Sequence, residues 1–202
     1  MSASDEFYPA VVTAIEERNP EGLAVLLAQH IGQVDPEMLC HAVHANCVKC
    51  VELLIPHCGA DNIFYGLGEA GTLDRLECAQ VLAQHCKMDA IVMAAGDAAQ
   101  AGSLRTLRFF STLCDFCDNE SWPLQMACWG KQYDIIDYLY PLSNPSEALE
   151  CLRKDIEKYG AIKTLAIVEG TEYLQNLVDS CAQRQRLIAQ IAANPTVRGR
   201  KL

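Results

Sequence analysis

Eleven cysteines and five histidines are the side chains of this 202-residue chain with the widest choice of chemistry. Four of the cysteines form two pairs with the spacing of metal or redox motifs, Cys47-x-x-Cys50 and Cys114-x-x-Cys117. Four thiolates that converge on one point would hold a tetrahedral zinc ion, and a single pair could interconvert between dithiol and disulfide. Whether either chemistry occurs depends on where the fold places the pairs.

The cysteines recur at a fixed step in the numbering. The step from Cys50 to Cys78 is 28, and Cys58, Cys86 and Cys114 keep the same spacing. In a stack of repeated units, equivalent residues lie too far apart for a disulfide, which needs Cα atoms within about 7 Å. The two Cys-x-x-Cys pairs belong to units two apart, so about 20 Å would separate them, twice the packing distance of about 10 Å. The four-cysteine zinc site is therefore excluded if the units stack.

A local metal site is the alternative, made by His41, His44, Cys47 and Cys50. Burial explains the recurring cysteine position better, because a free cysteine behaves as a small hydrophobic residue. We predict reduced thiols, no metal, no cofactor and no catalytic residue. The acidic start, MSASDEFYPA, lacks the features of a secretory signal, so we expect a reducing, cytoplasmic compartment, either in the producing cell or after delivery into a host cell.

Alanine marks the same repeat through the first half of the chain. Four alanines follow one another at the step of the cysteines, and they are Ala14, Ala42, Ala70 and Ala98. A fixed period of this length is typical of one supersecondary unit that stacks on copies of itself. Such arrays usually act by presenting a surface to a partner.

Each unit is predicted to be a pair of helices. Asp35-Pro36 supplies an N-cap and a proline suited to the first helical position. The first helix should end near His44, with a break at Asn46, and a second apolar helix should follow from Val48 to Ile55. Two helices of this size cannot bury their apolar faces alone, so stacked neighbours must cover them.

Motifs in the later copies resemble the ankyrin-repeat family. Residues 122–128, WPLQMAC, are similar to its Thr-Pro-Leu-His-x-Ala-Ala signature, and residues 133–139 are similar to its second helix. Residues 98–102 match its Ala-Ala-x-x-Gly turn, and residues 58–62 resemble its closing Gly-Ala-Asp segment. The resemblance spans about residues 10–142.

The resemblance implies an all-α, ankyrin-like helical-hairpin solenoid, with five divergent repeats in residues 8–142. The family period is about 33 residues, whereas the step here is 28 or 29. The missing residues would come from the loop that forms a projecting β-hairpin finger in the family. We therefore expect short loops and no β-sheet. A helical-hairpin repeat of another family is the alternative.

Residues 146–202 do not continue the repeat. A helix should begin at Asn144-Pro145 and run to about Lys158, and a longer helix should begin at Thr171 and end at Asn194-Pro195. The last unit of an array needs a polar outer cover. We predict a C-terminal helical cap, or alternatively partner-binding helices with a basic tail.

Charge is divided unevenly along the chain. Residues 1–145 carry 19 acidic and 7 basic side chains, a net charge of −12, whereas residues 146–202 carry 7 acidic and 9 basic ones, a net charge of +2. An acidic body repels polyanions, so nucleic acid is not an expected partner. No run of eighteen apolar residues is present, so a membrane is not expected either.

The resemblance also implies a binding face, because ankyrin-like arrays bind chiefly through their first helices along the concave side. The positions carried over are Glu16, Glu17, His41, His44, Glu69, Thr72, Asp97, Gln100, Met126 and Trp129. Four carboxylates among them predict a protein partner with a basic surface. Met126 and Trp129 would add an apolar anchor, unless Trp129 packs against the cap instead.

These observations predict a protein-protein interaction module, either an adaptor or an effector. The alternative is an enzyme, or an enzyme-like effector, whose chemistry lies in residues 146–202. Cys151 and Cys181 are the candidate nucleophiles there, and both lie on apolar helix faces.

Overall fold

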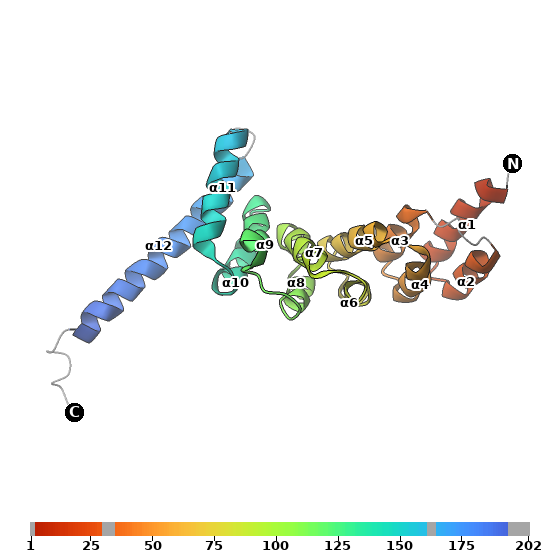
Figure 1. Cartoon of the computed structure of the whole chain (residues 1–202), viewed down its shortest axis with the longest axis horizontal. Helices are drawn as coiled ribbons and strands as arrows, with labels where there is room; N and C mark the ends of the chain where they lie inside the picture. Colours follow the sequence, from red (N-terminus) through yellow and green to blue (C-terminus); the bar gives the residue numbers. More distant parts are fainter. Residues whose placement is uncertain (1–2, 30–34, 161–164, 194–202) are drawn as a thin grey trace, which may run out of the picture.

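The computed structural model describes residues 3–29, 35–160 and 165–193, and it contains no strand within them. Five helix pairs follow one another in a row (Figure 1). The first helices of the pairs are α1 (Ala3–Glu16), α3 (Pro36–His44), α5 (Ala60–Thr72), α7 (Met88–Ala101) and α9 (Asp118–Trp129). The second helices are α2 (Pro20–Gln29), α4 (Val48–Leu54), α6 (Leu76–Ala83), α8 (Leu104–Phe110) and α10 (Tyr133–Leu139).

The two sets of helices form two layers, and each first helix packs on the first helices of the neighbouring pairs (Figure 1). Single 3₁₀ turns, η1 (Ile55–His57) and η2 (Tyr140–Leu142), extend α4 and α10. The all-α helical-hairpin array predicted from the sequence is confirmed.

A left-handed residue makes the turn inside every pair. The five residues have φ between 51° and 82°, and they are Arg18, Asn46, Asp74, Gly102 and Lys131. They follow one another at the step of the recurring alanines, lengthened by one before Lys131, so the turn keeps the period of the sequence. Glycine, asparagine and aspartate adopt this conformation at the lowest cost.

The same turn explains why alanine recurs at one position of the repeat. Its carbonyl accepts a hydrogen bond of 2.8–3.0 Å from the amide five residues later, and the acceptors are Ala14, Ala42, Ala70, Ala98 and Ala127. The amide of each left-handed residue donates to the carbonyl three residues before it, at 2.9–3.3 Å. Together these are the two bonds of a Schellman motif, which satisfies the last carbonyls of a helix. All five alanines are buried, so a larger side chain would not fit between the layers.

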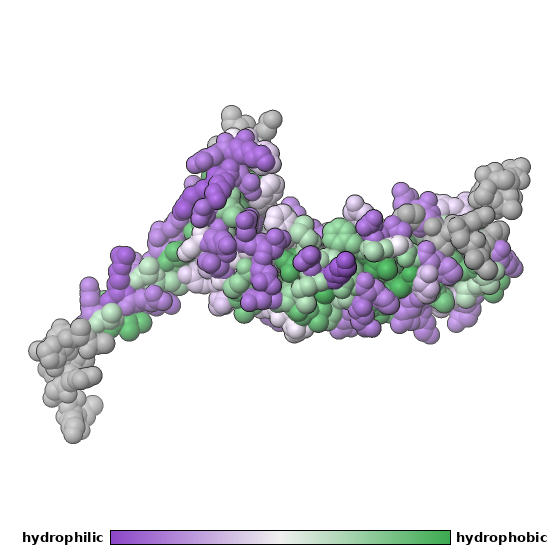
Figure 2. All heavy atoms as spheres, viewed as in Figure 1, coloured by the Kyte–Doolittle hydropathy of each residue, from purple (hydrophilic) through white to green (hydrophobic). Residues whose placement is uncertain are grey.

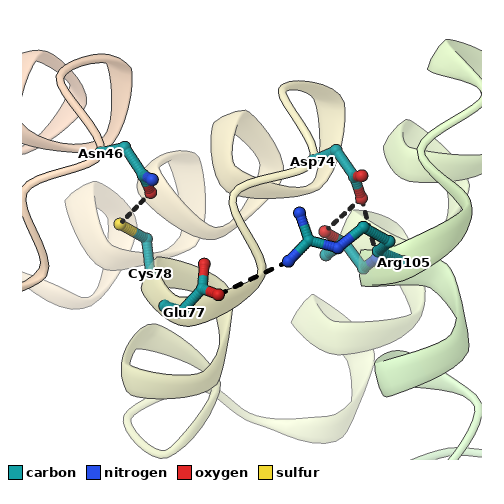
Figure 3. Close-up of polar contacts among 6 residues, drawn as sticks. Asn46, Asp74, Glu77, Cys78 and Arg105 are labelled. Atoms are coloured by element: carbon teal, nitrogen blue, oxygen red, sulfur yellow. Dashed lines mark hydrogen bonds and ion pairs between the residues drawn. The ribbon is translucent and has the colours of Figure 1, made fainter.

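Polar contacts connect two of the turns to the next pair (Figure 3). The Asp74 carboxylate accepts hydrogen bonds from the backbone amide and the hydroxyl of Thr106, both at 2.9 Å. Asn46 occupies the position of Asp74 in the preceding pair and accepts from the thiol of Cys78, at 3.6 Å. Cys78 is the repeat equivalent of Thr106. A hydrogen bond to the side chain of the left-handed turn residue therefore recurs at two interfaces, with a thiol as the donor at one and a hydroxyl and an amide at the other.

Three glycines in α5 allow close packing between pairs. A Cβ on Gly71 would lie 2.8 Å from the carbonyl oxygen of Ala94, and a Cβ on Gly66 would lie 3.1 Å from the side chain of Leu39. Gly68 faces the carboxylate of Asp97 in the same way. The glycine-rich stretch therefore serves helix packing.

A left-handed stretch precedes the regular part of α9. Asn119, Glu120 and Ser121 all have φ between 51° and 59°, so regular α-helix resumes at Trp122. The buried Ser121 hydroxyl accepts a hydrogen bond from the amide of Asn144, at 2.9 Å. This contact links the start of the fifth pair to the start of the C-terminal helices.

Two C-terminal helices follow the array, α11 (Pro145–Tyr159) and α12 (Leu165–Ala193). Asn144 caps α11 through the amide of Glu147, as predicted. The prediction that the second helix begins at Thr171 is wrong, because α12 already includes Leu165. The hydroxyl of Thr171 is buried and donates to the Ile167 carbonyl one turn earlier, so it does not cap the helix. The predicted end at Asn194-Pro195 lies outside the described residues.

The first half of α12 covers the fifth pair. A Cβ on Gly170 would clash with the backbone of Cys128, so the two helices lie in close contact. Lys131 pairs with Glu169 at 2.6 Å, and the Tyr173 hydroxyl donates to Asp137 at 2.9 Å. Beyond Ala182 every described side chain is exposed, and this end of the helix projects away from the array (Figure 1).

Candidate protein-interaction face

The residues predicted to bind a partner form two rows on the first helices. The central row contains His41, Glu69, Asp97 and Met126, with Thr13 at the equivalent position of the first pair. The turn row, one helical turn further on, contains Glu16, His44, Thr72, Gln100 and Trp129. Members of each row are spaced by the repeat period, so each row crosses all five pairs. Glu17 lies next to the turn row and is exposed.

Direct contacts connect the rows across three pairs. The hydroxyl of Tyr8 lies 3.2 Å from Nε2 of His41 and 3.3 Å from the carboxylate of Glu37. His44 Nε2 lies 3.0 Å from the carboxylate of Glu69, with both side chains about half exposed. The structure therefore brings together the predicted residues of α3 and α5.

Asp97 of α7 extends the contact between His44 and Glu69 to the fourth pair, and we call these three side chains the polar line. Its carboxylate lies against Gly68, where a Cβ would approach within 2.8 Å. Burial raises the pKa of Asp97, and the negative charge of Glu69 raises it further. Two carboxylates from neighbouring pairs thus share a partly buried site, and each makes the other's charge less favourable.

The apolar end of the predicted face is less accessible than the sequence suggests. Met126 is only 8% exposed, and its side chain packs against Gly96 of α7. Trp129 is half-buried against the hydrophobic core. Thr72 and Gln100 are exposed, and their backbone carbonyls accept side-chain hydrogen bonds from Ser103 and Gln132 of the following pair.

Two further rows lie on the same first helices and were missed in the sequence. The N-terminal row contains Asp61, Asp89 and Asp118, all exposed. The apolar row, four residues later, contains Tyr65, Met93 and Trp122, of which Tyr65 is 64% exposed. Both rows keep the repeat period, which was the signal that could have revealed them. Hydrophobic side chains reach the surface over the central pairs in the space-filling view (Figure 2).

The local metal site considered from the sequence is not assembled. His41 contacts Tyr8, His44 contacts Glu69, and Cys47 and Cys50 are buried. Within the ranges that the structure describes, no group of three or more His, Cys, Asp or Glu side chains is arranged to hold a metal ion.

Burial keeps the interior thiols protonated. It raises the pKa of Cys50 and of Cys128 to about 12, with a hydrogen bond between Cys50 and Cys47 adding to the effect at Cys50. The thiolate is the reactive form, so both thiols should be inert at neutral pH. Cys117 is exposed, although burial of its sulfur and the nearby Asp115 raise its pKa as well.

We expect alkylation of the native protein to be slow and to begin at Cys117, with Cys50, Cys78 and Cys128 modified only after unfolding. Intact mass spectrometry after timed exposure to iodoacetamide would measure the order. Unfolding in guanidinium should expose all eleven thiols and serves as the control. A stoichiometric zinc adduct in native spectra, or rapid labelling of Cys128, would contradict the structural role of these thiols.

Cys151, one of the two C-terminal candidates for nucleophilic chemistry, lies beside a carboxylate. The Cys151 thiol donates a hydrogen bond to the Glu120 carboxylate at 3.3 Å. Burial and this carboxylate raise the pKa of Cys151 to about 11. The thiolate is the nucleophilic form of cysteine, so a raised pKa leaves little of the reactive form of Cys151 at neutral pH. Among the described residues, no helix combines the length and hydropathy needed to span a membrane.

Comparison with known proteins identifies the architecture. No family model matches the chain, and no curated protein matches its sequence. A solved structure, the crystal structure of the human ASB11 ankyrin repeat domain, is similar to it with a TM-score of 0.53 and 18% sequence identity. The match covers 82% of this chain and 82% of that chain. At this identity the likeness establishes the fold.

Proposed function

We propose that this chain, which has the ankyrin-repeat fold, is a protein-interaction module. It would act as an adaptor or an effector and bind a partner along the exposed face of its first helices. The fold supports a binding role in general, since stacked repeats offer an extended surface. The partner is proposed to be a protein or peptide with a basic surface, and neither nucleic acid nor a membrane.

The single observation that carries this proposal is the polar line from His44 through Glu69 to Asp97. Side chains from three consecutive helix pairs meet in it, although they are far apart in the chain. The partly buried Asp97 carboxylate has a raised pKa because of burial and of Glu69. An approaching cation would relieve this electrostatic cost, which favours a basic partner over a neutral one.

Charge reversal on this face is expected to slow association. We expect the triple variant Glu16→Lys, Glu17→Lys and Glu69→Lys to lower the association rate constant about tenfold at low salt, with a flatter salt dependence, because charges of one sign steer an opposite partner. The measurement is surface plasmon resonance at two ionic strengths, with the partner captured by the wild-type protein from lysate.

A matched control places the same charge change on the second helices. Glu21, Glu52 and Asp134 are all exposed there, and their replacement by lysine alters the net charge equally. If the control slows association as much as the first variant, total charge matters and the proposed face is not the binding surface.

A further inference from the structure

The apolar row is bordered by carboxylates on both sides. In α5, Asp61, Tyr65 and Glu69 follow one another at intervals of four residues, so they lie along one face of the helix. In α7, Asp89, Met93 and Asp97 repeat the arrangement. Two neighbouring pairs therefore present the same order across the helix: an acid, a large apolar side chain and a second acid.

Surface hollows separate the members of the apolar row. Tyr65 lines a hollow between α3 and α5, together with Cys40 and Glu37. Met93 lines a hollow between α5 and α7, whose other walls include Phe64 and Asp61.

Met93 also lines a hollow between α7 and α9 and another that Trp122 borders. The apolar side chains therefore stand between depressions that could receive the side chains of a partner. The cations beside these hollows are Lys87 and Lys154.

We propose that these rows bind an extended partner segment in which an apolar residue recurs every third position and Lys or Arg occupies positions between. The inference rests on the proposed interaction function and defines the chemistry of the partner. The segment would run along the array, across the first helices, with its apolar residues in the hollows between α3 and α5, between α5 and α7, and between α7 and α9.

The spacing of the helices favours a period of three. Packed helix axes lie about 8–10 Å apart. A polyproline II segment has three residues per turn and rises about 9.3 Å per turn, so every third side chain meets a successive helix in the same way. A β-strand repeats the same face after about 6.6 Å, which does not match.

The width of the strip favours an extended chain over a helix. Four residues of α-helix span about 6 Å, so each acidic row is about 6 Å from the apolar row. A helical partner, about 10–12 Å in diameter, would cover both acidic rows with its own body. The three side-chain columns of a polyproline II segment instead place one column on the apolar row and the other two toward Asp61 and Asp89 on one side and Glu69 and Asp97 on the other.

Synthetic peptides test the period directly. We expect a fluorescent peptide with three Leu-Pro-Lys units to bind the full chain at least about tenfold more tightly than a scrambled peptide of the same composition, measured by anisotropy at low salt. A peptide with glutamate in place of lysine should bind at least as weakly as the scrambled one, because the flanking rows are acidic.

Variants of the chain locate the site. Met93→Asp should reduce affinity for the Leu-Pro-Lys peptide at least about tenfold, because it removes the central apolar contact and adds a charge. Val25→Asp is the matched control, since Val25 is an exposed apolar residue on the second helix of the first pair. Circular dichroism melting of both variants would establish that they are folded. Asp89→Asn should weaken binding less and reduce its dependence on salt.

The outcomes are distinguishable from those of the proposed function. Equal binding of the ordered and scrambled peptides, or Met93→Asp binding as tightly as Val25→Asp, would overturn the period-three site while leaving a protein partner possible elsewhere on the face. Tighter binding of a helical peptide with apolar residues every seventh position would also overturn it. If the wild-type chain captures no protein from lysate and binds none of the peptides, the interaction function itself fails.

Discussion

Removal of residues 146–202 is expected to lower the free energy of unfolding of the remaining array by several kcal/mol. The segment covers the fifth pair through the close contact of Gly170 with Cys128, the Lys131–Glu169 pair and the Tyr173–Asp137 hydrogen bond. Re-exposing a few hundred Å² of apolar surface at about 25 cal/mol per Å² gives that magnitude. The loss is comparable with the ~5–15 kcal/mol that stabilises a typical domain. Chemical denaturation followed by circular dichroism would measure it.

A shorter truncation provides the control. Ending the chain at Ala182 removes the part of α12 whose described side chains are all exposed, so the midpoint of unfolding should hardly change. If the longer truncation melts like the full chain and stays monomeric, residues 146–202 act as a separate arm and not as a cover.

Replacement of Asp74 by alanine is expected to cost about 3 kcal/mol of stability, because two hydrogen bonds to a charged acceptor are lost and their donors become unpaired. Both donors belong to Thr106, which is fully buried near the start of α8. Asp74 also adopts a left-handed conformation that alanine disfavours. The carboxylate thus caps the helix of the next pair, where a negative charge is favourable.

Two comparisons separate these effects. Asp74→Asn keeps a side-chain oxygen and a residue that tolerates the left-handed conformation, so it should cost clearly less than Asp74→Ala. Glu77→Ala breaks the exposed Glu77–Arg105 pair at the same interface, where the two atoms lie 3.5 Å apart, and should cost less than about 1 kcal/mol. Equal losses in the three variants would mean that the Asp74–Thr106 contact contributes nothing specific.

Periodicity made the helix pairs predictable, because the same residues serve the same turn. The alanine at position 42 or 70 accepts the closing bond of its Schellman motif, and Asn46 or Asp74 supplies the left-handed residue. The buried alanine and the left-handed residue are both required by the local turn, so these residue types recur in the sequence with the repeat period.

Structural features that occur only once could not be predicted from the sequence period. Three successive left-handed residues at 119–121 have no sequence signature, and the last of them accepts a hydrogen bond from the distant amide of Asn144. The start of α12 was missed because Thr171 looks like a helix cap, whereas its hydroxyl bonds within the helix. Met126 was expected on the surface, but the absence of a side chain at Gly96 leaves room for it to be buried.

The proposed binding face shows the same difference between features that repeat and features that do not. The positions of the central and turn rows could be inferred from the repeat, and the contact between His44 and Glu69 agrees with their placement on adjacent helices. The apolar row was overlooked because Tyr65, Met93 and Trp122 differ in type. Only their shared position in the repeat relates them.

The exposed end of α12 would move further than the rest of the helix if the helix tilted on the array. From Ala182, beyond which every described side chain is exposed, to Ala193 is about 16 Å of helix, so a tilt of about 10° would move the tip by about 3 Å. A tilt of α12 relative to the fifth pair would therefore displace the tip more than the contact. A fluorophore near Ile188 and a second one on the array would report such shifts as changes in energy transfer, long before they were visible as a change in the fold.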